Sequence, residues 1–169
     1  SPRAIEASPM KAIPFRSIAS RISSTTILAG VLLAGVPTLR AGPPTPVRVS
    51  ASAGWVSTGV TVQDGDTLTL RANGRAATAR PPEFTASRSG PEGQPWICEG
   101  AIGDCGACAL DGVPYGALIG RIGAEGTPFL VGAGGTWTAE GEGELFLAIN
   151  DNELCIDENT GGYLVQIRH

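Results

Sequence analysis

Lysine, histidine and methionine are nearly missing from this sequence of 169 residues, since each occurs once, as Lys11, His169 and Met10. A single histidine makes a catalytic mechanism with a histidine base hard to build. The carboxylates offer no clear substitute, because their densest group lies in one loop and does not flank a cleft, as glycosidase carboxylates do. We therefore expect a protein without enzymatic activity.

Helical periodicity is missing as well. Beyond residue 42 no stretch shows an apolar period of about 3.6 residues, and 24 glycines and 13 prolines disfavour long helices. Apolar and polar residues alternate instead, with turn signals about every eight to twelve residues. This pattern predicts an all-β fold, a two-sheet β-sandwich, for which we expect jelly-roll connectivity. The expected strands cover 47–52, 60–62, 67–72, 116–122, 129–131, 136–138, 144–150 and 162–168.

Basic residues are scarce in the main part of the sequence. Residues 42–169 hold seven arginines against fifteen carboxylates, 7 − 15 = −8, whereas residues 1–41 balance at 5 − 1 = +4. An acidic body repels phosphate backbones, so we expect no nucleic-acid partner. The acidity suits either a cation-binding domain or one that is simply kept in solution by its charge.

No apolar run reaches the roughly 20 residues of a comfortable membrane span. From Met10 a basic segment leads into an apolar run of about fifteen residues, which has the shape of a secretory signal. We expect cleavage near Ala41; in the alternative, residues 1–41 remain as a signal anchor at a membrane. A proline-rich linker at 42–46 then precedes a domain at 47–169. In both cases the domain is periplasmic or secreted.

The four cysteines are an even set, which in an exported chain indicates disulfides. They are Cys98, Cys105, Cys108 and Cys155. Zinc binding and redox chemistry are the alternatives, but neither a second close pair nor a thioredoxin-like pattern accompanies the CxxC spacing at 105–108. A bond within that spacing would close a very small loop and stabilise little. We therefore predict that Cys155 pairs with Cys105 or Cys108 and that Cys98 takes the other.

The segment 150–162 carries most of the chemical information, because four carboxylates and three asparagines lie there between two expected strands. The carboxylates are those of Asp151, Glu153, Asp157 and Glu158. Ca²⁺ takes about six to eight oxygen ligands of these kinds, and Gly161 and Gly162 would let the backbone turn around an ion. By composition alone, a calcium site and a plain polar loop are equally supported.

Four segments carry a family resemblance. They are YGALIGRIG at 115–123, PFLVG at 128–132, LFLAIND at 145–151 and NTGGY at 159–163. Together they resemble the PA-IL-type bacterial galactose-binding lectins and related modules of exported bacterial proteins, over about 47–167 and most weakly at 79–114. The resemblance implies a small galactose-binding-domain-like jelly roll in which one Ca²⁺ joins the protein to two sugar hydroxyls.

Position by position, the resemblance implies a set of ligands. Asp151 would bind both the ion and the sugar, and Glu158 and Asn159 would be side-chain ligands of the ion. Cys155 and Thr78 would each ligate through the backbone carbonyl. Asn159 would also belong to the sugar site.

Three departures from the family bear on the sugar. Glu158 stands where the family has an asparagine, which adds charge and narrows the room for a sugar. Cys155 replaces a residue whose hydroxyl helps to hold the sugar. The family's histidine and glutamine contacts fall within 79–114, where histidine is absent and Gln94 is the single glutamine.

Aromatic residues supply one further candidate, because sugar rings pack their C–H groups on aromatic faces. Trp96 lies in the irregular stretch next to a cysteine, so we expect it to serve the sugar site. Trp55 and Trp137 lie in or beside expected strands and are assigned to the core.

The leading hypothesis is therefore an exported, calcium-dependent carbohydrate-binding module with a galactose-like ligand. Single sites of this kind bind weakly, so a homo-oligomer would raise the avidity. The rival hypothesis is a non-catalytic extrinsic subunit that uses the same sandwich to stabilise a membrane protein complex on the periplasmic side. Retention of residues 1–41 in the mature protein would favour the rival.

Overall fold

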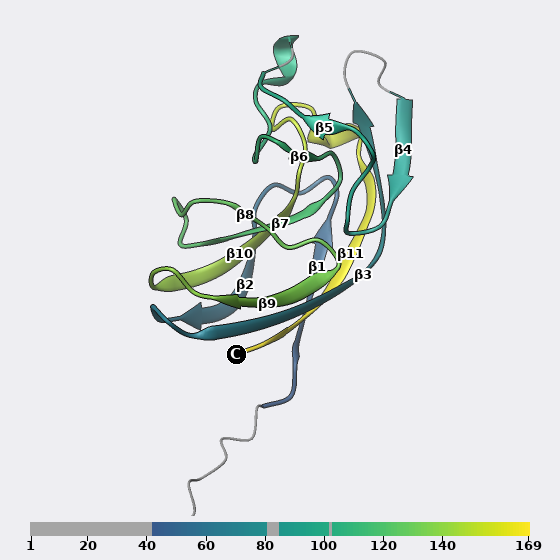
Figure 1. Ribbon diagram of the computed structural model, residues 1–169. Helices are drawn as coiled ribbons and strands as arrows, with labels where there is room; N and C mark the ends of the chain where they lie inside the picture. The colour runs from purple at the N-terminus through teal and green to yellow at the C-terminus, as the bar shows by residue number, and fades with distance from the viewer. Residues whose placement is uncertain (1–41, 81–84, 102) are drawn as a thin grey trace, which may run out of the picture. The chain divides into compact units, whose positions relative to one another are not determined.

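The computed structural model describes residues 42–80, 85–101 and 103–169, which belong to one compact unit (Figure 1). Its elements are β1 (Thr45–Ser50), β2 (Val56–Val62), β3 (Thr67–Arg80), β4 (Thr85–Ser89), β5 (Ile97–Cys98), η1 (Gly103–Cys105), β6 (Val113–Pro114), β7 (Leu118–Ile122), β8 (Phe129–Leu130), β9 (Gly134–Thr138), β10 (Gly143–Ile149), η2 (Ile156–Glu158) and β11 (Thr160–Arg168). Within these described ranges, no helix has the length and apolarity needed to cross a membrane. The predicted signal or anchor segment, 1–41, lies outside the described residues.

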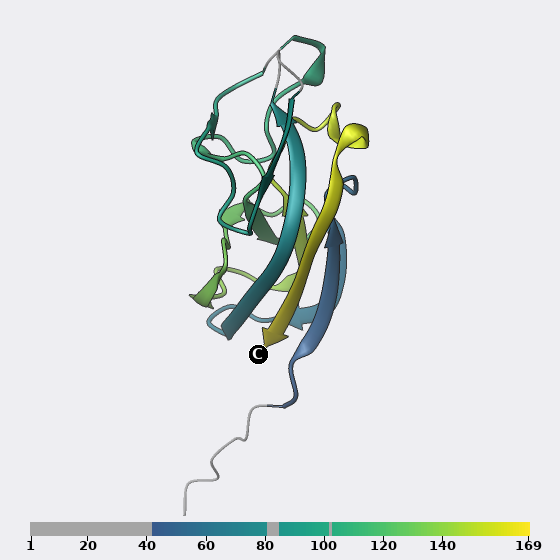
Figure 2. The same cartoon turned by 90° about the vertical axis from the view of Figure 1, so that its right-hand side faces the viewer.

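Two antiparallel sheets form the sandwich. Sheet A has the order β1-β11-β3-β4, with β9 pairing with the first part of β3, and sheet B has the order β2-β10-β7-β8. Figure 2 shows β1, β11 and β3 of sheet A side by side. The short strands β5 and β6 pair with each other apart from both sheets. The predicted all-β, two-sheet β-sandwich is confirmed.

The core lies between the two sheets and follows the period-two pattern of the sequence. It takes Leu145, Leu147 and Ile149 from β10 and Tyr163, Val165 and Ile167 from β11. A slip of one residue would turn either set toward solvent, so burial fixes the register of both strands. In consequence the connection from β10 to β11, residues 150–159, emerges at one defined end of the sandwich.

The sequence located the strands with strong alternation and missed those without it. β3 continues to Arg80, beyond the predicted end at 72, because small residues replace the large apolar ones there. β4, β5 and β6 were not predicted, since they are short and lie in the irregular 79–114 stretch. β1 begins at Thr45, so the last two residues of the predicted linker belong to a strand, at a sheet edge where a proline is tolerated.

Candidate functional site

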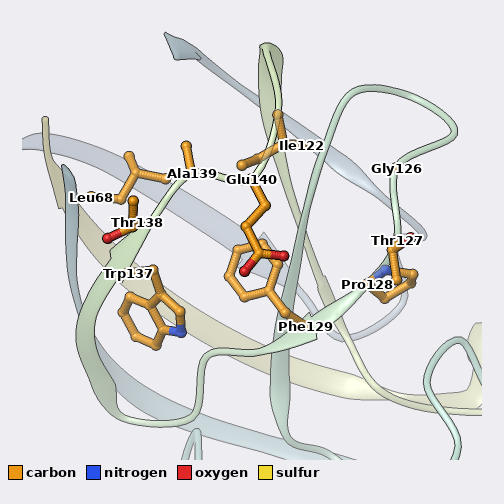
Figure 3. A pocket seen from close by; sticks show the side chains of 10 residues that line it. All are labelled: Leu68, Ile122, Gly126, Thr127, Pro128, Phe129, Trp137, Thr138, Ala139 and Glu140. Atoms are coloured by element: carbon orange, nitrogen blue, oxygen red, sulfur yellow. The ribbon is translucent and has the colours of Figure 1, made fainter. Parts of the chain in front are cut away.

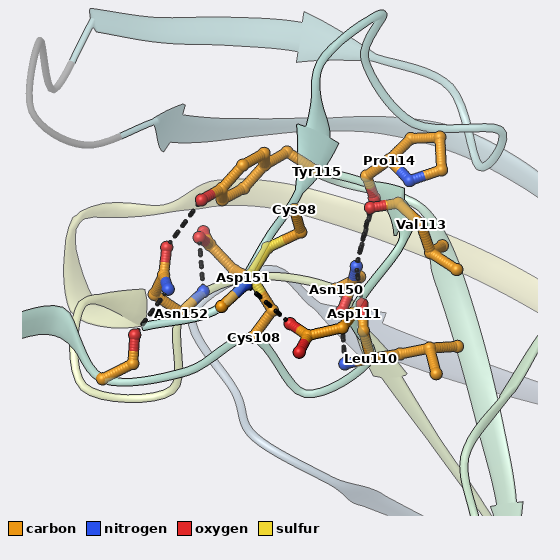
Figure 4. Close-up of a disulfide and its surroundings, with 12 residues drawn as sticks. Cys98, Cys108, Leu110, Asp111, Val113, Pro114, Tyr115, Asn150, Asp151 and Asn152 are labelled. Carbon is orange, nitrogen blue, oxygen red and sulfur yellow. Dashed lines mark hydrogen bonds between the residues drawn. A yellow bond between two sulfur atoms is a disulfide. The ribbon is translucent and has the colours of Figure 1, made fainter. Parts of the chain in front are cut away.

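Two disulfides fasten the loops at the end of the sandwich where β10 stops. Cys105 bonds to Cys155, and Cys98 bonds to Cys108. The predicted pattern is confirmed, and of the two partners left open for Cys155 the structure takes Cys105. The second bond is buried with the Tyr115 ring in a small cluster of its own (Figure 4). The cysteine-rich loop is thus tied both to itself and to the 150–159 connection.

Asn150 and Asn152 are fully buried and hold these loops together by hydrogen bonds. The Asn150 side chain accepts from the Leu110 backbone N–H at 2.9 Å and donates to the Leu110 carbonyl at 2.9 Å. The Asn152 side chain accepts from the Tyr115 hydroxyl at 2.9 Å and donates to the Gly106 carbonyl at 2.7 Å. Since their donors and acceptors are used in this way, these two asparagines are structural, although composition had grouped them with candidate ion ligands.

Replacing Asn152 by alanine should destabilise the fold by about 3 kcal/mol, because the hydrogen bonds to the buried Tyr115 hydroxyl and to the half-buried Gly106 carbonyl are both lost. Urea unfolding measures the change. The matched control is Asn73→Ala, since Asn73 is exposed on β3 and its side chain makes no hydrogen bond to a described residue. A loss below about 0.5 kcal/mol for Asn152→Ala would contradict the structural role.

Asp151 lies between these two asparagines in sequence and contacts Asn159. Its carboxylate is almost fully buried and accepts from the Asn159 amide at 2.7 Å and from the Asn152 backbone N–H at 2.7 Å. The Asn159 amide also donates to the Ala51 carbonyl at 3.2 Å. No arginine, lysine or histidine of the described residues forms an ion pair with this carboxylate. A buried carboxylate without a cation is costly, so the position favours a positive ion.

Burial raises the pKa of Asp151 above its ordinary value of 3.8, and the hydrogen bonds from Asn159 and Asn152 offset this only in part. The folded state therefore holds the proton more tightly than the unfolded state does. The free energy of unfolding then falls as pH rises from the ordinary value through the raised one, and the loss persists above it.

Asp151→Asn should remove this pH dependence. In the metal-free protein, the free energy of unfolding of the variant minus that of the native chain should grow from about pH 4 upward and level off above the raised pKa. Urea titrations between pH 4 and pH 8 in the presence of chelator measure the difference. Subtracting the two curves cancels the opposite contribution of Glu144, whose pKa is lowered by its hydrogen bonds to Ser57 and Gly59. A difference that shrinks with pH would contradict the assignment.

The other ligands implied by the family resemblance lie around this pair. Glu158 is exposed at the end of η2, one residue before Asn159, and Cys155 is half-buried just before that helix. The ladder pairs Ala77 of β3 with Thr160, so Thr78 lies one step further, level with Asn159. Thr78 is fully buried, and its carbonyl accepts from the Gln94 amide at 3.0 Å.

Gln94, the single glutamine of the 79–114 stretch, is buried and turned inward. Its amide nitrogen also donates to the Ser87 carbonyl at 3.1 Å and to the Thr78 hydroxyl. Its amide oxygen is buried without a hydrogen-bond partner among the described residues. In this arrangement Gln94 fixes the Thr78 carbonyl and is not presented to a ligand at the surface.

The two glycines expected to bend the backbone around an ion instead allow close pairing of strands, so that expectation was wrong. Gly161 and Gly162 lie inside β11, with φ of 81° and 152°. A Cβ on Gly161 would collide with the Arg75 carbonyl of β3, and one on Gly162 with the Val49 carbonyl of β1. They permit β11 to pair closely with its two neighbours.

A shallow hollow of about 160 Å³ lies beside Asp151. It is lined by Ala53, Gly54, Trp55, Ala109, Ala148, Ile149, Asp151, Glu153 and Ile156. Trp96, expected at the sugar site, is 49% exposed but does not line it. Trp55, expected in the core, is half-buried and does line it, with the Arg121 guanidinium 4.3 Å from its ring centre. The sequence held one sign that Trp55 lies at a loop and not in the core: it follows Gly54 and precedes the first residue of β2.

Another hollow, of about 350 Å³, lies at the opposite end of the sandwich between β9 and the β7–β8 turn (Figure 3). Phe129 and Trp137 form part of its wall, with their ring centres 6.2 Å apart. Both side chains also pack against the main core, as expected for Trp137. None of the predicted site residues lines this hollow.

The polar groups in contact around Asp151 include its own carboxylate, the Asn159 amide and, through that amide, the Ala51 carbonyl. No group of three or more histidine, cysteine, aspartate or glutamate side chains suited to a metal occurs in the described part of the chain. Ca²⁺, in contrast, accepts carbonyl and amide oxygens beside a carboxylate. The Asn159 amide would have to turn its oxygen toward Asp151 to take part, and Glu158, its neighbour in the sequence, is exposed.

The described residues form a two-sheet β-sandwich whose loops are joined at one end by two disulfides. One solved structure with a similar fold is the EclA N-terminal domain, a PllA-like lectin, with a TM-score of 0.54 and 23% identity over 76% of this chain and 98% of that chain. The predicted resemblance to PA-IL-type lectin modules is confirmed at the level of the fold. No protein-family model and no curated protein matches the sequence.

Proposed function

We propose that this chain is an exported carbohydrate-binding module without enzymatic activity, with its sugar site at the end of the sandwich marked by Asp151 and Asn159. The observation that carries the proposal is the buried Asp151 carboxylate, which contacts Asn159 and has no cation partner among the described residues. The lectin-type fold supports it, because the similar structure is described as a PllA-like lectin. The two disulfides suit an oxidising compartment outside the cytoplasm.

Calcium dependence is part of the proposal. The side chains of Asp151, Glu158 and Asn159 and the carbonyls of Cys155 and Thr78 would hold one Ca²⁺. The bound ion would exchange water for two sugar hydroxyls. Asp151 and Asn159 would orient the sugar next to the ion, and the Cys105–Cys155 bond would fix the backbone that carries the Cys155 carbonyl.

The ligand class is a galactose-like sugar, with specificity set by the 79–114 stretch. Gln94 is turned inward, so it does not supply the family's glutamine contact in this arrangement. Trp55 borders the hollow beside Asp151 and offers an aromatic surface nearer to the ion than Trp96 does, because Trp96 lies outside the lining. We therefore expect weak single-site binding that self-association would strengthen.

The test is calorimetric titration of Ca²⁺ into the chelator-stripped chain, followed by a glycan array with Ca²⁺ or with chelator. Micromolar binding, a rise in melting temperature and galactose binding that needs Ca²⁺ would support the proposal. Sugar binding that persists in chelator would refute the role of the ion. An absence of both heat and thermal shift would refute the ion site, and co-purification with membranes would then test the extrinsic-subunit alternative.

A further inference from the structure

Arginines are unevenly distributed over the two sheets. Residues 42–169 contain seven arginines, and six of them lie on strands of sheet A, at positions Arg48, Arg71, Arg75, Arg80, Arg88 and Arg168. None of the fifteen carboxylates of the same range lies on a strand of sheet A. A domain with a net charge of 7 − 15 = −8 therefore carries one sheet whose charged side chains are all positive.

Five of these cations are exposed: Arg48, Arg71, Arg75, Arg88 and Arg168. Arg71 and Arg75 are exposed on β3, where they alternate with buried residues such as Leu70. Arg168 is exposed at the end of β11, next to buried Ile167. The ladder pairs Arg71 with Gln166, so Arg71 and Arg168 are diagonal neighbours, which lie about 7–8 Å apart in antiparallel sheets.

A groove crosses this face through two adjoining hollows. The first, of about 260 Å³, is lined by Pro44, Thr69, Arg71, Gln166 and Arg168. The second, of about 300 Å³, is lined by Thr69, Leu70, Arg71, Ala133, Gly134, Gly135 and Thr136. They share Thr69 and Arg71, so the path runs from β11 over β3 to β9, with one arginine at its middle and another at its end.

Neither Arg71 nor Arg168 forms a hydrogen bond or an ion pair with a described residue. A guanidinium presents a planar set of donors that matches a carboxylate or a sulfate in bidentate fashion. Thr69 and Gln166, which line the first hollow together with the two arginines, suit hydroxyl groups. Leu164 is the one large apolar side chain counted as exposed on the described part of β11, at 39%, so the face lacks the apolar wedge of a membrane-binding surface.

From the groove and its unpaired cations, we propose that the outer face of sheet A binds an acidic polysaccharide. A chain with carboxylate or sulfate groups would cross β11, β3 and β9 and place anionic groups on Arg71 and Arg168. An extended chain suits two adjoining hollows better than a single small anion does. The other exposed cations of the sheet, Arg48, Arg75 and Arg88, would attract further anionic groups of the same polysaccharide.

This surface is separate from the site at Asp151. β11 begins directly after Asn159 and runs nine residues to Arg168, a distance on the order of 25 Å. Binding at the groove therefore needs no Ca²⁺ and can be measured in chelator. Failure of the polysaccharide proposal and failure of the calcium-dependent sugar proposal are distinguishable for this reason.

The experiment measures binding of the full chain to dextran sulfate, polygalacturonate and neutral dextran in chelator at low salt. The native chain should bind the two anionic polymers and not neutral dextran. Arg71→Ala combined with Arg168→Ala should weaken binding at least about tenfold, since two charge-assisted contacts are lost. The matched control is Ala101→Glu with Ala124→Glu, which lowers the net charge by the same two units at exposed positions off sheet A and should change binding less than about twofold.

Other outcomes would overturn the proposal. Equal losses in the two double variants would mean that net charge alone governs binding. Capture by phosphatidylglycerol vesicles without binding of either polymer would assign the face to a membrane. Self-association at low salt that the arginine variant abolishes, again without polymer binding, would assign it to a second copy of this chain. Unfolding midpoints establish that both variants fold, and Arg71→Lys with Arg168→Lys, which keeps the charge, should lose less affinity than the alanine pair.

Discussion

Asp151→Asn is expected to lower the Ca²⁺ affinity by a factor on the order of 100 or more, and to abolish calcium-dependent sugar binding. Asp151 supplies the one buried carboxylate of the proposed site, since Glu158 is exposed. An amide has the same shape but brings no net charge to the ion. Calorimetric titration of Ca²⁺ measures the change.

The same substitution should leave the metal-free protein at least as stable as the native chain at neutral pH. Burial raises the pKa of Asp151, so its ionised form costs stability in the absence of a cation, and the uncharged amide removes that cost. Loss of affinity together with unchanged or higher stability separates the removal of a ligand from misfolding. A variant that loses both would indicate a structural role for the carboxylate.

Asp157→Asn is the matched control for this prediction. Asp157 lies in the same connection, within η2, but it is exposed and does not occupy a position implied by the family resemblance. Its removal changes the charge near the ion by the same amount without removing a ligand, so the affinity should fall by less than about threefold. A loss as large as that of Asp151→Asn would show that the loop attracts Ca²⁺ by its net charge alone.

Removing the Cys105–Cys155 bond by paired alanine substitutions should lower the free energy of unfolding by about 4 kcal/mol. The bond joins residues that are 50 positions apart, so it removes much freedom from the unfolded chain. It also holds Cys155, which precedes η2 and the residues proposed to bind the ion. Urea unfolding at 25 °C under oxidising conditions measures the loss, and Ca²⁺ affinity should fall as well.

The second disulfide supplies the internal comparison. Cys98 and Cys108 are only 10 positions apart, so removing their bond should cost about 3 kcal/mol and should leave the backbone at Cys155 attached. The Cys105–Cys155 variant should therefore lose more Ca²⁺ affinity than the Cys98–Cys108 variant does. Equal affinities in the two variants would show that the staple at Cys155 does not organise the ion site.

Alternate residues at the start of the 150–159 connection have different partners. This arrangement explains how a polar loop remains ordered at the end of a sandwich. Asn150 and Asn152 hold the cysteine-rich loop through hydrogen bonds. Asp151, between them, contacts Asn159 instead. The structural asparagines thus fix the backbone on both sides of Asp151, so that the proposed ligand is positioned before any ion binds.

Much of the fold followed from alternation alone. β10 and β11 were predicted nearly to their ends, because large apolar residues at every second position have one burial pattern that satisfies them. The second part of β3 was missed, since its run of alanines and a glycine presents little apolar contrast between its two faces. β4 was missed because its residues are small or polar and read as a loop.

The candidate site could be predicted as a segment but not as an arrangement. The resemblance selected Asp151 and Asn159, and the structure places them in contact. It also selected Trp96, whereas Trp55 lines the hollow beside Asp151. Which tryptophan lies beside Asp151 depends on where the loop before β2 meets the end of β10. A contact between residues about a hundred positions apart leaves no periodic signal in the sequence.

The sequence by itself determined the all-β class, the disulfide bonding of the cysteines and the segment that carries the candidate ligands, because strand periodicity, cysteine parity and local composition are properties of neighbouring residues. Tertiary structure alone decided which cysteine Cys155 joins, which asparagines are structural, and that six of the seven arginines of residues 42–169 lie on the strands of one sheet. These depend on which strands pair and on how loops distant in sequence meet. Burial of the core selects those pairings over the whole chain at once, and no local pattern records the result.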